Sequence, residues 1–440
     1  MPDSKSSTPH RRILFGMLAG AVAGLAANAL WGSTEQLQTF VKTVTYPAGQ
    51  IFLRLIFMVV IPLVFSALVL GVAELGDVRR LGRIGLKTLL FTIVLSSSSV
   101  VLGVALVNLV HPGSGMDQAE KDSLMQILGQ SAAQVQKPPQ KEGLQILVDL
   151  IPENPLKSMV DAFKGEMLAV MVFSLLIGIA MMLCERKRVE PLIELLRAVY
   201  EVVMMVISLA MKLAPFGVAA LLFSLTARFG LEILSKLGWY VATVVVGLAL
   251  HQFGVYSLVL KYIVRYPPRL FFSRIREVML TAFSTSSSNA TLPVSMRVAE
   301  TELGVPRHIG SFVLTVGSTA NQNGTALYEG ITVLFLAQFF GLELSLGAQI
   351  TVVVMSILAG VGTAGVPGGS LPMVGALLVS IGVPWEGIGI ILGVDRLLDM
   401  CRTVLNVTGD VVAAAYVARS EGYPLHDGPR PLQATDPVLR

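Results

Sequence analysis

The pattern of hydrophobic and polar positions divides the chain into long apolar runs separated by short polar connections. Residues 13–30, 51–72, 86–110 and 168–183 are such runs. A helix needs roughly 20 apolar residues to cross about 30 Å of hydrocarbon, so we expect these runs to be membrane-spanning helices. The first run follows basic residues but continues without a small-residue cleavage pattern, which favours a retained helix over a signal peptide.

Basic residues gather in alternate connections, and this alternation predicts the orientation of the chain. Lys and Arg are enriched in cytoplasmic connections, so the intervening connections are expected outside and both termini inside. The basic connections lie at residues 10–12, 79–87, 186–188 and 261–276. The outer connections are expected at residues 31–42, 111–164 and 229–236. Six crossings then return residue 265 to the cytoplasm.

After residue 265 the apolar runs are interrupted by clusters of serine and glycine. These clusters lie at residues 283–288, 317–324 and 360–370. Irregular backbone at membrane depth is tolerated only where it is buried in protein or lines a cavity. Paired interrupted segments therefore point to the binding site of a transporter.

Composition supports a multi-pass protein of a cell or inner membrane. The chain has 440 residues, of which 53% are hydrophobic and 14% charged, with a mean hydropathy of +0.71. This lies outside the range of soluble domains. The net charge of +4 bears on membrane orientation, and nucleic acid is not expected as a partner. Two cysteines exclude a disulfide framework, and zinc, dinucleotide and P-loop motifs are missing, so an enzyme is not expected.

The segment GVDRLLDMCRTVLNVTGD, residues 393–410, places charged groups between apolar runs. At about 100° per residue, its polar side chains share a helical face roughly 80° wide. That face carries Asp395, Asp399, Arg402, Asn406 and Asp410, with Arg402 counted as its only cation. Two alternatives stay open at this point. The segment could be a solvated surface helix, or an internal seam in which Arg402 pairs with Asp399 or Asp395.

Three further clusters carry candidate chemistry. FSTSSSNATLP, residues 283–293, supplies hydroxyls and amides at a tight turn. GSTANQNGTALYEG, residues 317–330, is predicted to be a broken helix whose carbonyls can bind a cation. GVGTAGVPGGS, residues 360–370, is either a flexible loop or, given its apolar flanks, the tip of a re-entrant hairpin.

Four segments of the chain together resemble the dicarboxylate/amino acid:cation symporters, which include the excitatory amino-acid transporters. These segments are SSSNATLP, NQNGTALY, GTAGVPGG and DRLLDMCRTVLNVTGD. The resemblance implies an all-α polytopic membrane protein with eight transmembrane helices and two re-entrant helical hairpins. It also implies an elevator-type transporter that forms a homotrimer in the lipid bilayer. The implied parts are scaffold helices 1 and 2 (1–82), transport helix 3 (83–110), an outer loop (111–165), scaffold helices 4 and 5 (166–228), the remaining transport domain (229–418) and a cytoplasmic tail (419–440).

The same resemblance implies a site for an acidic amino acid, aspartate or glutamate. Asp399 holds the α-ammonium, Asn406 and Thr403 contact the α-carboxylate, and Arg402 pairs with the side-chain carboxylate. A guanidinium can bind a carboxylate through two parallel hydrogen bonds, which suits that role. The implied site is completed by Ser287, Ser288, Thr325 and Val366.

Coupling ions, Na⁺ and/or H⁺, are implied at three places. The first sodium site comprises Gly317, Asn321, Asn406 and Asp410, and the second comprises Thr319, Gln322, Gly360, Val361 and Thr363. A third site comprises Thr92, Leu95, Ser96 and Asn323. Relatives usually carry an aspartate where this chain has Asn323, and Leu95 has no side-chain oxygen. We therefore expect a degenerate third cation site and coupling to fewer sodium ions or to protons, with Asp395 as the proton carrier.

The sequence leaves other functions open. The chain could be a C4-dicarboxylate or neutral amino-acid symporter of the same family. An anion-conducting channel is a different class, although one asymmetric site is unlike a filter. A hydrolase using Ser286 would lack a nearby base. His251 and Cys401 are interpreted as packing residues.

Overall fold

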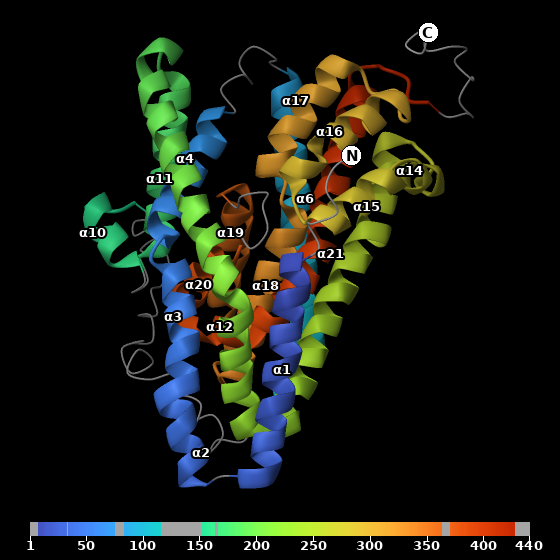
Figure 1. Ribbon diagram of the computed structural model, residues 1–440. Coiled ribbons are helices and arrows are strands. Elements are labelled where there is room, and N and C mark those ends of the chain that lie inside the picture. Colours follow the sequence, from blue (N-terminus) through green and yellow to red (C-terminus); the bar gives the residue numbers. More distant parts are fainter. Residues whose placement is uncertain are drawn as a thin grey trace, which may run out of the picture.

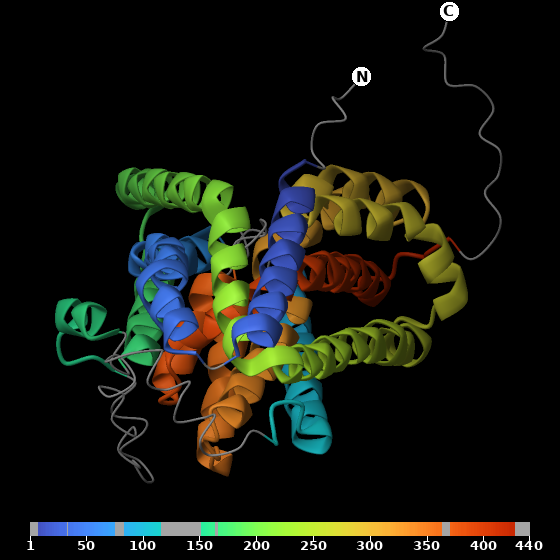
Figure 2. The same ribbon diagram turned by 60° about the horizontal axis from the view of Figure 1, so that its bottom comes forward.

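The computed structural model describes residues 8–32, 34–74, 83–115, 151–162, 166–362 and 370–426. Within these residues the chain is helical and contains no β-strand, as the all-α prediction requires. Figures 1 and 2 show two groups of helices that meet along the middle of the molecule. One group comes mainly from the first half of the chain, and the other mainly from the second half.

The first group is built around the long helix α12. Its members are α1 (Thr8–Trp31), α2 (Glu35–Phe40), the π-helix η1 (Val41–Thr45), α3 (Tyr46–Phe57), α4 (Val60–Glu74), α10 (Pro155–Val160), α11 (Met167–Leu183) and the first arm of α12 (Arg186–Ala249). Helix α1 packs closely along α12 because it carries glycines at the contact. A Cβ atom at Gly16 would lie 2.3 Å from the carbonyl oxygen of Pro215. Small residues allow such close backbone contact between membrane helices.

Helix α12 reverses direction at Gly230, where φ is 60° and ψ is −140°. This conformation is readily accessible only to glycine. The predicted outer connection at residues 229–236 is therefore wrong in extent, because the chain is helical on both sides of this single residue. The predicted connection at residues 31–42 is likewise mostly helical. The second arm of α12 continues through η4 (Leu250–Val255), α13 (Tyr256–Leu258) and η5 (Val259–Val264).

The second group surrounds α21, which lies in the middle of both views (Figures 1 and 2). Helices α15 and α16 pack against each other and against α21, and α19 contacts α20. Helix α18 is buried along its whole length except at Gln338. The members are α6 (Arg83–Val110), α14 (Pro268–Arg274), α15 (Arg276–Thr285), α16 (Ser288–Thr301), α17 (Arg307–Ala320), α18 (Asn323–Phe339), α19 (Leu346–Gly362), α20 (Leu371–Ser380), the short turn η6 (Trp385–Gly387) and α21 (Ile388–Ser420).

Several helices have the length and apolar character of membrane spans. Among the described residues, three helical stretches qualify by length and composition, namely Glu35–Ala73, Arg83–Val110 and Arg186–Val264, and four shorter apolar helices accompany them. Large apolar side chains cover the outside of the molecule: Phe15 is 74% exposed and Phe216 is 76% exposed. An exterior of this kind fits contact with lipid.

Candidate functional site

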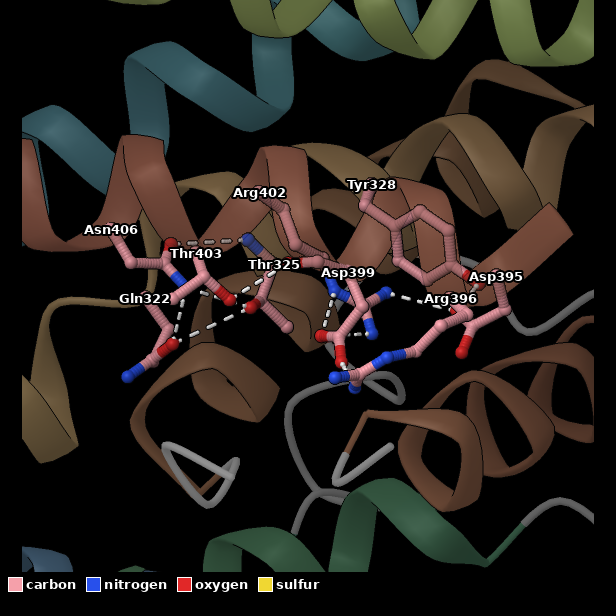
Figure 3. Close-up of polar contacts among 9 residues, drawn as sticks. All are labelled: Gln322, Thr325, Tyr328, Asp395, Arg396, Asp399, Arg402, Thr403 and Asn406. Atoms are coloured by element: carbon pink, nitrogen blue, oxygen red, sulfur yellow. Dashed lines mark hydrogen bonds and ion pairs between the residues drawn. The ribbon is translucent and has the colours of Figure 1, made fainter. Parts of the chain in front are cut away.

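The polar face of α21 is buried inside the second group of helices. The five polar residues of this face are each 5% exposed or less, namely Asp395, Asp399, Arg402, Asn406 and Asp410. In Figure 3 the side chains of Asp395, Asp399 and Arg402 point toward one another, and Asn406 points toward Gln322 and Thr325. This burial excludes the alternative of a solvated surface helix. Buried charges must be paired or functional, because an unpaired charge in a protein interior is costly.

Arg402 makes the pairs that the second alternative anticipated. Its Nε and Nη2 atoms donate to Oδ1 of Asp399 at 3.0 and 2.8 Å, and its Nη1 donates to Oδ1 of Asp395 at 3.2 Å. The guanidinium also lies 4.2 Å from the ring centroid of Tyr328, whose hydroxyl donates to Asp395 at 2.8 Å. Arg402 is thus held by two carboxylates and one aromatic face.

Arg396 is a second cation that reasoning from the sequence missed. Its Nη1 donates to Oδ2 of Asp399 at 3.0 Å, on the opposite side of the carboxylate from Arg402 (Figure 3). The prediction that Arg402 is the only cation of this site is therefore wrong. Arg396 lies about 60° from Asp399 on the helical wheel, and its long side chain spans that gap as an i, i+3 pair.

The predicted broken helix is confirmed. Helix α17 ends at Ala320 and α18 begins at Asn323, so Asn321 and Gln322 leave the helical conformation. The first turn of α18 has free N–H groups, and Asn406 of α21 satisfies two of them. Its Oδ1 accepts from the backbone N–H of Gly324 at 2.7 Å and of Thr325 at 3.3 Å. Because the helix is broken here, the N-terminus of α18 can hydrogen-bond to Asn406 of α21.

The side chain of Gln322 links the predicted substrate and ion residues. Its Oε1 accepts from the amide of Asn406 and from the hydroxyl of Thr325, and its Nε2 donates to the carbonyl of Ser318 at 3.0 Å. A Cβ atom at Gly360 would lie 3.6 Å from the carbonyl oxygen of Gln322, so these two members of the second sodium site are neighbours.

The other members of the predicted second sodium site are Thr319, Val361 and Thr363. Thr319 donates its hydroxyl to the carbonyl of Val316 in its own helix, at 3.0 Å. Val361 belongs to the last turn of α19. Thr363 and Val366 lie outside the described residues.

Three of the four residues of the first predicted sodium site lie together, namely Gly317, Asn321 and Asp410, whereas Asn406 forms its hydrogen bonds at the N-terminus of α18. Asn321 donates to Oδ1 of Asp410 at 2.9 Å, and a Cβ atom at Gly317 would lie 2.5 Å from the same oxygen. The Oδ1 atom of Asn321 is buried and accepts no hydrogen bond within the described part of the chain. A carboxylate, an unused amide oxygen and nearby carbonyls are the ligand types that a hard cation prefers. The donor set therefore fits a sodium ion.

The carboxamide of Asn323, in the third predicted site, is hydrogen-bonded at both ends. Ser96 donates to Oδ1 of Asn323 at 2.6 Å, and Nδ2 of Asn323 donates to the hydroxyl of Tyr256 at 2.9 Å. Thr92 and Leu95 are buried nearby on the same helix. Because the carboxamide of Asn323 already has partners at both ends, this cluster needs no cation to satisfy it.

The first serine-rich cluster forms the turn between α15 and α16. Ser286 has a φ of 50°, and the hydroxyl of Ser287 caps α16 by accepting from the N–H of Ala290 at 3.2 Å. Ser287 and Ser288 are both buried, and both flanking helices contact α21. Thr403 instead donates its hydroxyl to the carbonyl of Asp399 at 2.7 Å, within α21.

Glu329 is a buried acid that sequence reasoning did not single out. It follows Tyr328 on α18 and is fully buried. Among the described residues, neither of its carboxyl oxygens has a hydrogen-bond partner. In the sequence, Glu329 is a single acidic residue beside an apolar run, and this pattern could have marked it as a buried acid. The described residues also contain no group of three or more His, Cys, Asp or Glu that could hold a metal ion.

The expectation that His251 and Cys401 are packing residues agrees with the contacts of both side chains. His251 is buried, lies 3.1 Å from the hydroxyl of Ser98 and packs edge-to-face on Tyr256 with ring centroids 4.8 Å apart. The packing interpretation of His251 agrees with these contacts. Cys401 is half-buried against the main core and carries no disulfide.

Comparison with known proteins gives the same family over nearly the whole chain. The sequence model of the Sodium:dicarboxylate symporter family matches residues 10–420. A proton/sodium-glutamate symport protein of Bacillus subtilis (strain 168) is 36% identical over 418 residues, which cover 94% of each chain. A proton/glutamate-aspartate symporter of Escherichia coli (strain K12) is 34% identical over 413 residues, 93% of this chain and 92% of the relative.

A C4-dicarboxylate transport protein of Rhodospirillum rubrum is 30% identical over 435 residues, 96% of this chain and 92% of the relative. The family match spans α21, the broken helix α17–α18 and the serine-rich turn, so all the elements that build the buried site lie within it. The chain therefore belongs to the sodium:dicarboxylate symporter family, a family of transporters and not of enzymes.

Proposed function

We propose that this chain is a secondary active symporter that imports acidic amino acids, aspartate or glutamate, together with Na⁺ and/or H⁺. The observation that carries this proposal is the buried Arg402 held against Asp399 beside the broken helix. One cation and one anion at adjacent positions match the side-chain carboxylate and the α-ammonium of the substrate. Two relatives named as glutamate symporters support the choice of substrate.

Substrate binding in this proposal exchanges partners within the site. Arg402 turns from Asp395 and Asp399 to the side-chain carboxylate, and Asp399 receives the α-ammonium. Asn406 and Thr403 contact the α-carboxylate, with Ser287, Ser288, Thr325 and Val366 around it. The internal pairs of Arg402 keep its charge compensated until the substrate arrives, because an unpaired buried guanidinium would be costly.

A second candidate is a C4-dicarboxylate symporter, which the relative from Rhodospirillum rubrum favours. Asp399 would then face an anion instead of an ammonium group, which the charge of the site opposes. Competition against labelled aspartate uptake separates the candidates. Succinate should compete poorly and glutamate well, whereas equal competition by succinate would overturn the amino-acid assignment. Strong competition by neutral amino acids would instead indicate a neutral amino-acid symporter of the same family.

An anion channel remains the rival from another class. A channel dissipates gradients, whereas a symporter accumulates its substrate. Saturable uptake of labelled aspartate to a concentration above that outside would exclude a simple channel.

We further propose eight membrane helices, two re-entrant hairpins formed by α15–α16 and α19–α20, and cytoplasmic termini in the cell membrane. The first group of helices, with residues 1–82 and 166–228, would form the scaffold of a homotrimer. Residues 83–110 and 229–418 would move as the elevator. The division of the helices into two packed groups supports this arrangement. Light scattering that gives a monomer for the solubilised protein would contradict the trimer, and outward labelling of a cysteine added at either terminus would contradict the topology.

For the ions, we propose two sodium sites and a degenerate third. The first comprises Gly317, Asn321, Asn406 and Asp410, and its unused Asn321 oxygen supports it. The second comprises Thr319, Gln322, Gly360, Val361 and Thr363. The third, with Thr92, Ser96 and Asn323, is degenerate because Ser96 and Tyr256 already pair with the two ends of the Asn323 carboxamide. The additional positive charge of Arg396 also lowers the number of cations that must accompany the acidic substrate.

Protons are the second candidate for the coupling ion, and two carboxyl groups could carry one. Asp395 was the prediction from the sequence, but it accepts hydrogen bonds from Tyr328 and Arg402. Glu329 has no partner among the described residues, and an ionised carboxyl buried in this way is costly. We propose Glu329 as the stronger candidate. Uptake that keeps its full dependence on external pH in Glu329→Gln but loses it in Asp395→Asn would reverse this choice.

A further inference from the structure

Asp399 is shared between two arginines that approach it from different sides. Arg402 donates to its Oδ1 at 2.8 Å, and Arg396 donates to its Oδ2 at 3.0 Å (Figure 3). Arg402 has a place in the proposed recognition of the substrate, but Arg396 has none. A cation that contacts the carboxylate expected to hold the substrate ammonium therefore needs an explanation of its own.

Arg396 lies at the seam between the two groups of helices. Together with Asp395 and Asp399 it lines a cavity of about 20 Å³. The opposite wall comes from Ile13 of α1, Phe52 of α3 and Met211 of α12. Such a space has room for about one water molecule. The Arg396 side chain is 12% exposed, against 1% for Arg402, so Arg396 is the arginine with access to the seam.

The four charged residues of this part of α21 compensate one another. Asp395 and Asp399 carry two negative charges, and Arg396 and Arg402 carry two positive charges. All four are joined by ion pairs of 3.2 Å or less. Removing Arg396 would leave this row with one uncompensated negative charge. Moving an uncompensated charge through a medium of low dielectric constant is unfavourable.

We propose that Arg396 is a positioning residue that takes the place of the substrate ammonium on Asp399 while the site is empty. This inference rests on the proposed function, because it requires a substrate with an ammonium group. The arginine balances the charges of Asp395, Asp399 and Arg402 while the empty carrier returns across the membrane, and it competes with the incoming ammonium for Asp399. It therefore favours the return of the empty carrier at the expense of substrate affinity.

The test compares net uptake, which requires the return of the empty carrier, with exchange, which does not. Labelled aspartate would be supplied to proteoliposomes that are either empty or loaded with unlabelled aspartate. In Arg396→Gln we expect exchange to persist, with half-saturation at a several-fold lower aspartate concentration. Net uptake should fall by about tenfold relative to exchange, which corresponds to about 1.4 kcal/mol in the barrier of the return step.

Two further variants complete the design. Arg396→Lys keeps the positive charge and should restore most of the net uptake. Arg297→Gln removes an arginine from an exposed ion pair with Glu277 and should change neither rate. Equal losses of exchange and net uptake in Arg396→Gln would overturn the inference, and so would a higher half-saturating concentration. If the parent transports no aspartate at all, the proposed function fails and the inference fails with it.

Discussion

At the scale of single residues, we expect Arg402 to decide the class of substrate. Arg402→Cys should abolish uptake of acidic amino acids, because the substrate carboxylate loses its cation. Breaking a buried charge pair costs about 3–5 kcal/mol, so we expect at least an approximately hundredfold loss of apparent aspartate affinity. Uptake kinetics of labelled aspartate measure this directly. An unchanged affinity in the variant would remove Arg402 from the substrate site.

We expect Asn323 to limit the number of sodium ions that are coupled to each substrate. Asn323→Asp replaces an amide that donates to Tyr256 by a carboxylate that can bind a cation. We expect the variant to transport one more sodium ion per substrate, seen as a steeper dependence of the aspartate reversal potential on the sodium gradient. Asn323→Ser, which adds no charge, is the control. If the reversal potential of the parent already depends on the sodium gradient as steeply as that of Asn323→Asp, the argument about the third site is refuted.

Residues of the site differ in how well the sequence predicts them. The five polar positions of α21 could be predicted because they repeat on one helical face between runs apolar on all sides. Arg396 could not, because its backbone lies off that face and only a long side chain brings its charge to Asp399. Glu329 could not be assigned a role because its isolation depends on what surrounds α18 in space.

At the scale of elements, the close crossing of α18 and α21 depends on Gly324. A Cβ atom there would lie 2.5 Å from the carbonyl oxygen of Arg402, which is backbone and cannot move aside alone. Gly324→Ala should therefore force the two helices apart and cost about 1–3 kcal/mol of stability. Thermal unfolding of the solubilised protein checks this, together with loss of aspartate binding.

Gly238→Ala provides the matched control for that substitution. Nothing lies within 4 Å of a Cβ atom at Gly238, so the variant should be as stable as the parent or more so by up to about 1 kcal/mol. Equal stability of the two variants would show that α18 and α21 do not depend on this close approach.

The elements also show where patterns along the sequence stop being informative. The break at Asn321 and Gln322 was predictable from amides and glycine inside an apolar run. The sharp reversal at Gly230 was not, because one glycine in a left-handed conformation takes the place of a polar connection. The packing of α1 on α12 through Gly16 likewise depends on a partner nearly 200 positions away, which periodicity within one helix does not reveal.

At the scale of the whole molecule, Glu421 joins the beginning of α6 to the end of α21. It accepts from Arg83 at 2.5 Å and from Lys87 at 2.7 Å, and these bonds lower the pKa of Glu421 to about 2. A lowered pKa means that the contribution to stability is complete above the usual pKa of about 4.5 and is lost as the pH falls toward 2.

Melting temperatures of the parent and of Glu421→Gln should therefore differ by a constant amount near neutral pH and converge as the pH falls below about 4. High salt should narrow the difference, because Arg83 is largely exposed. Glu277→Gln, from a pair exposed on both sides, should have little effect. A difference that persists unchanged down to pH 2 would show that the charge of Glu421 is not the cause.

The central claim is that a cation gradient drives the accumulation of an acidic amino acid. The most direct test is uptake of labelled aspartate by proteoliposomes containing the full chain, with sodium, proton and potential gradients imposed one at a time. We predict accumulation above the external concentration when an inward sodium or proton gradient is imposed, and none in Arg402→Cys. Aspartate that only equilibrates across the membrane, whichever gradient is imposed, would contradict the account.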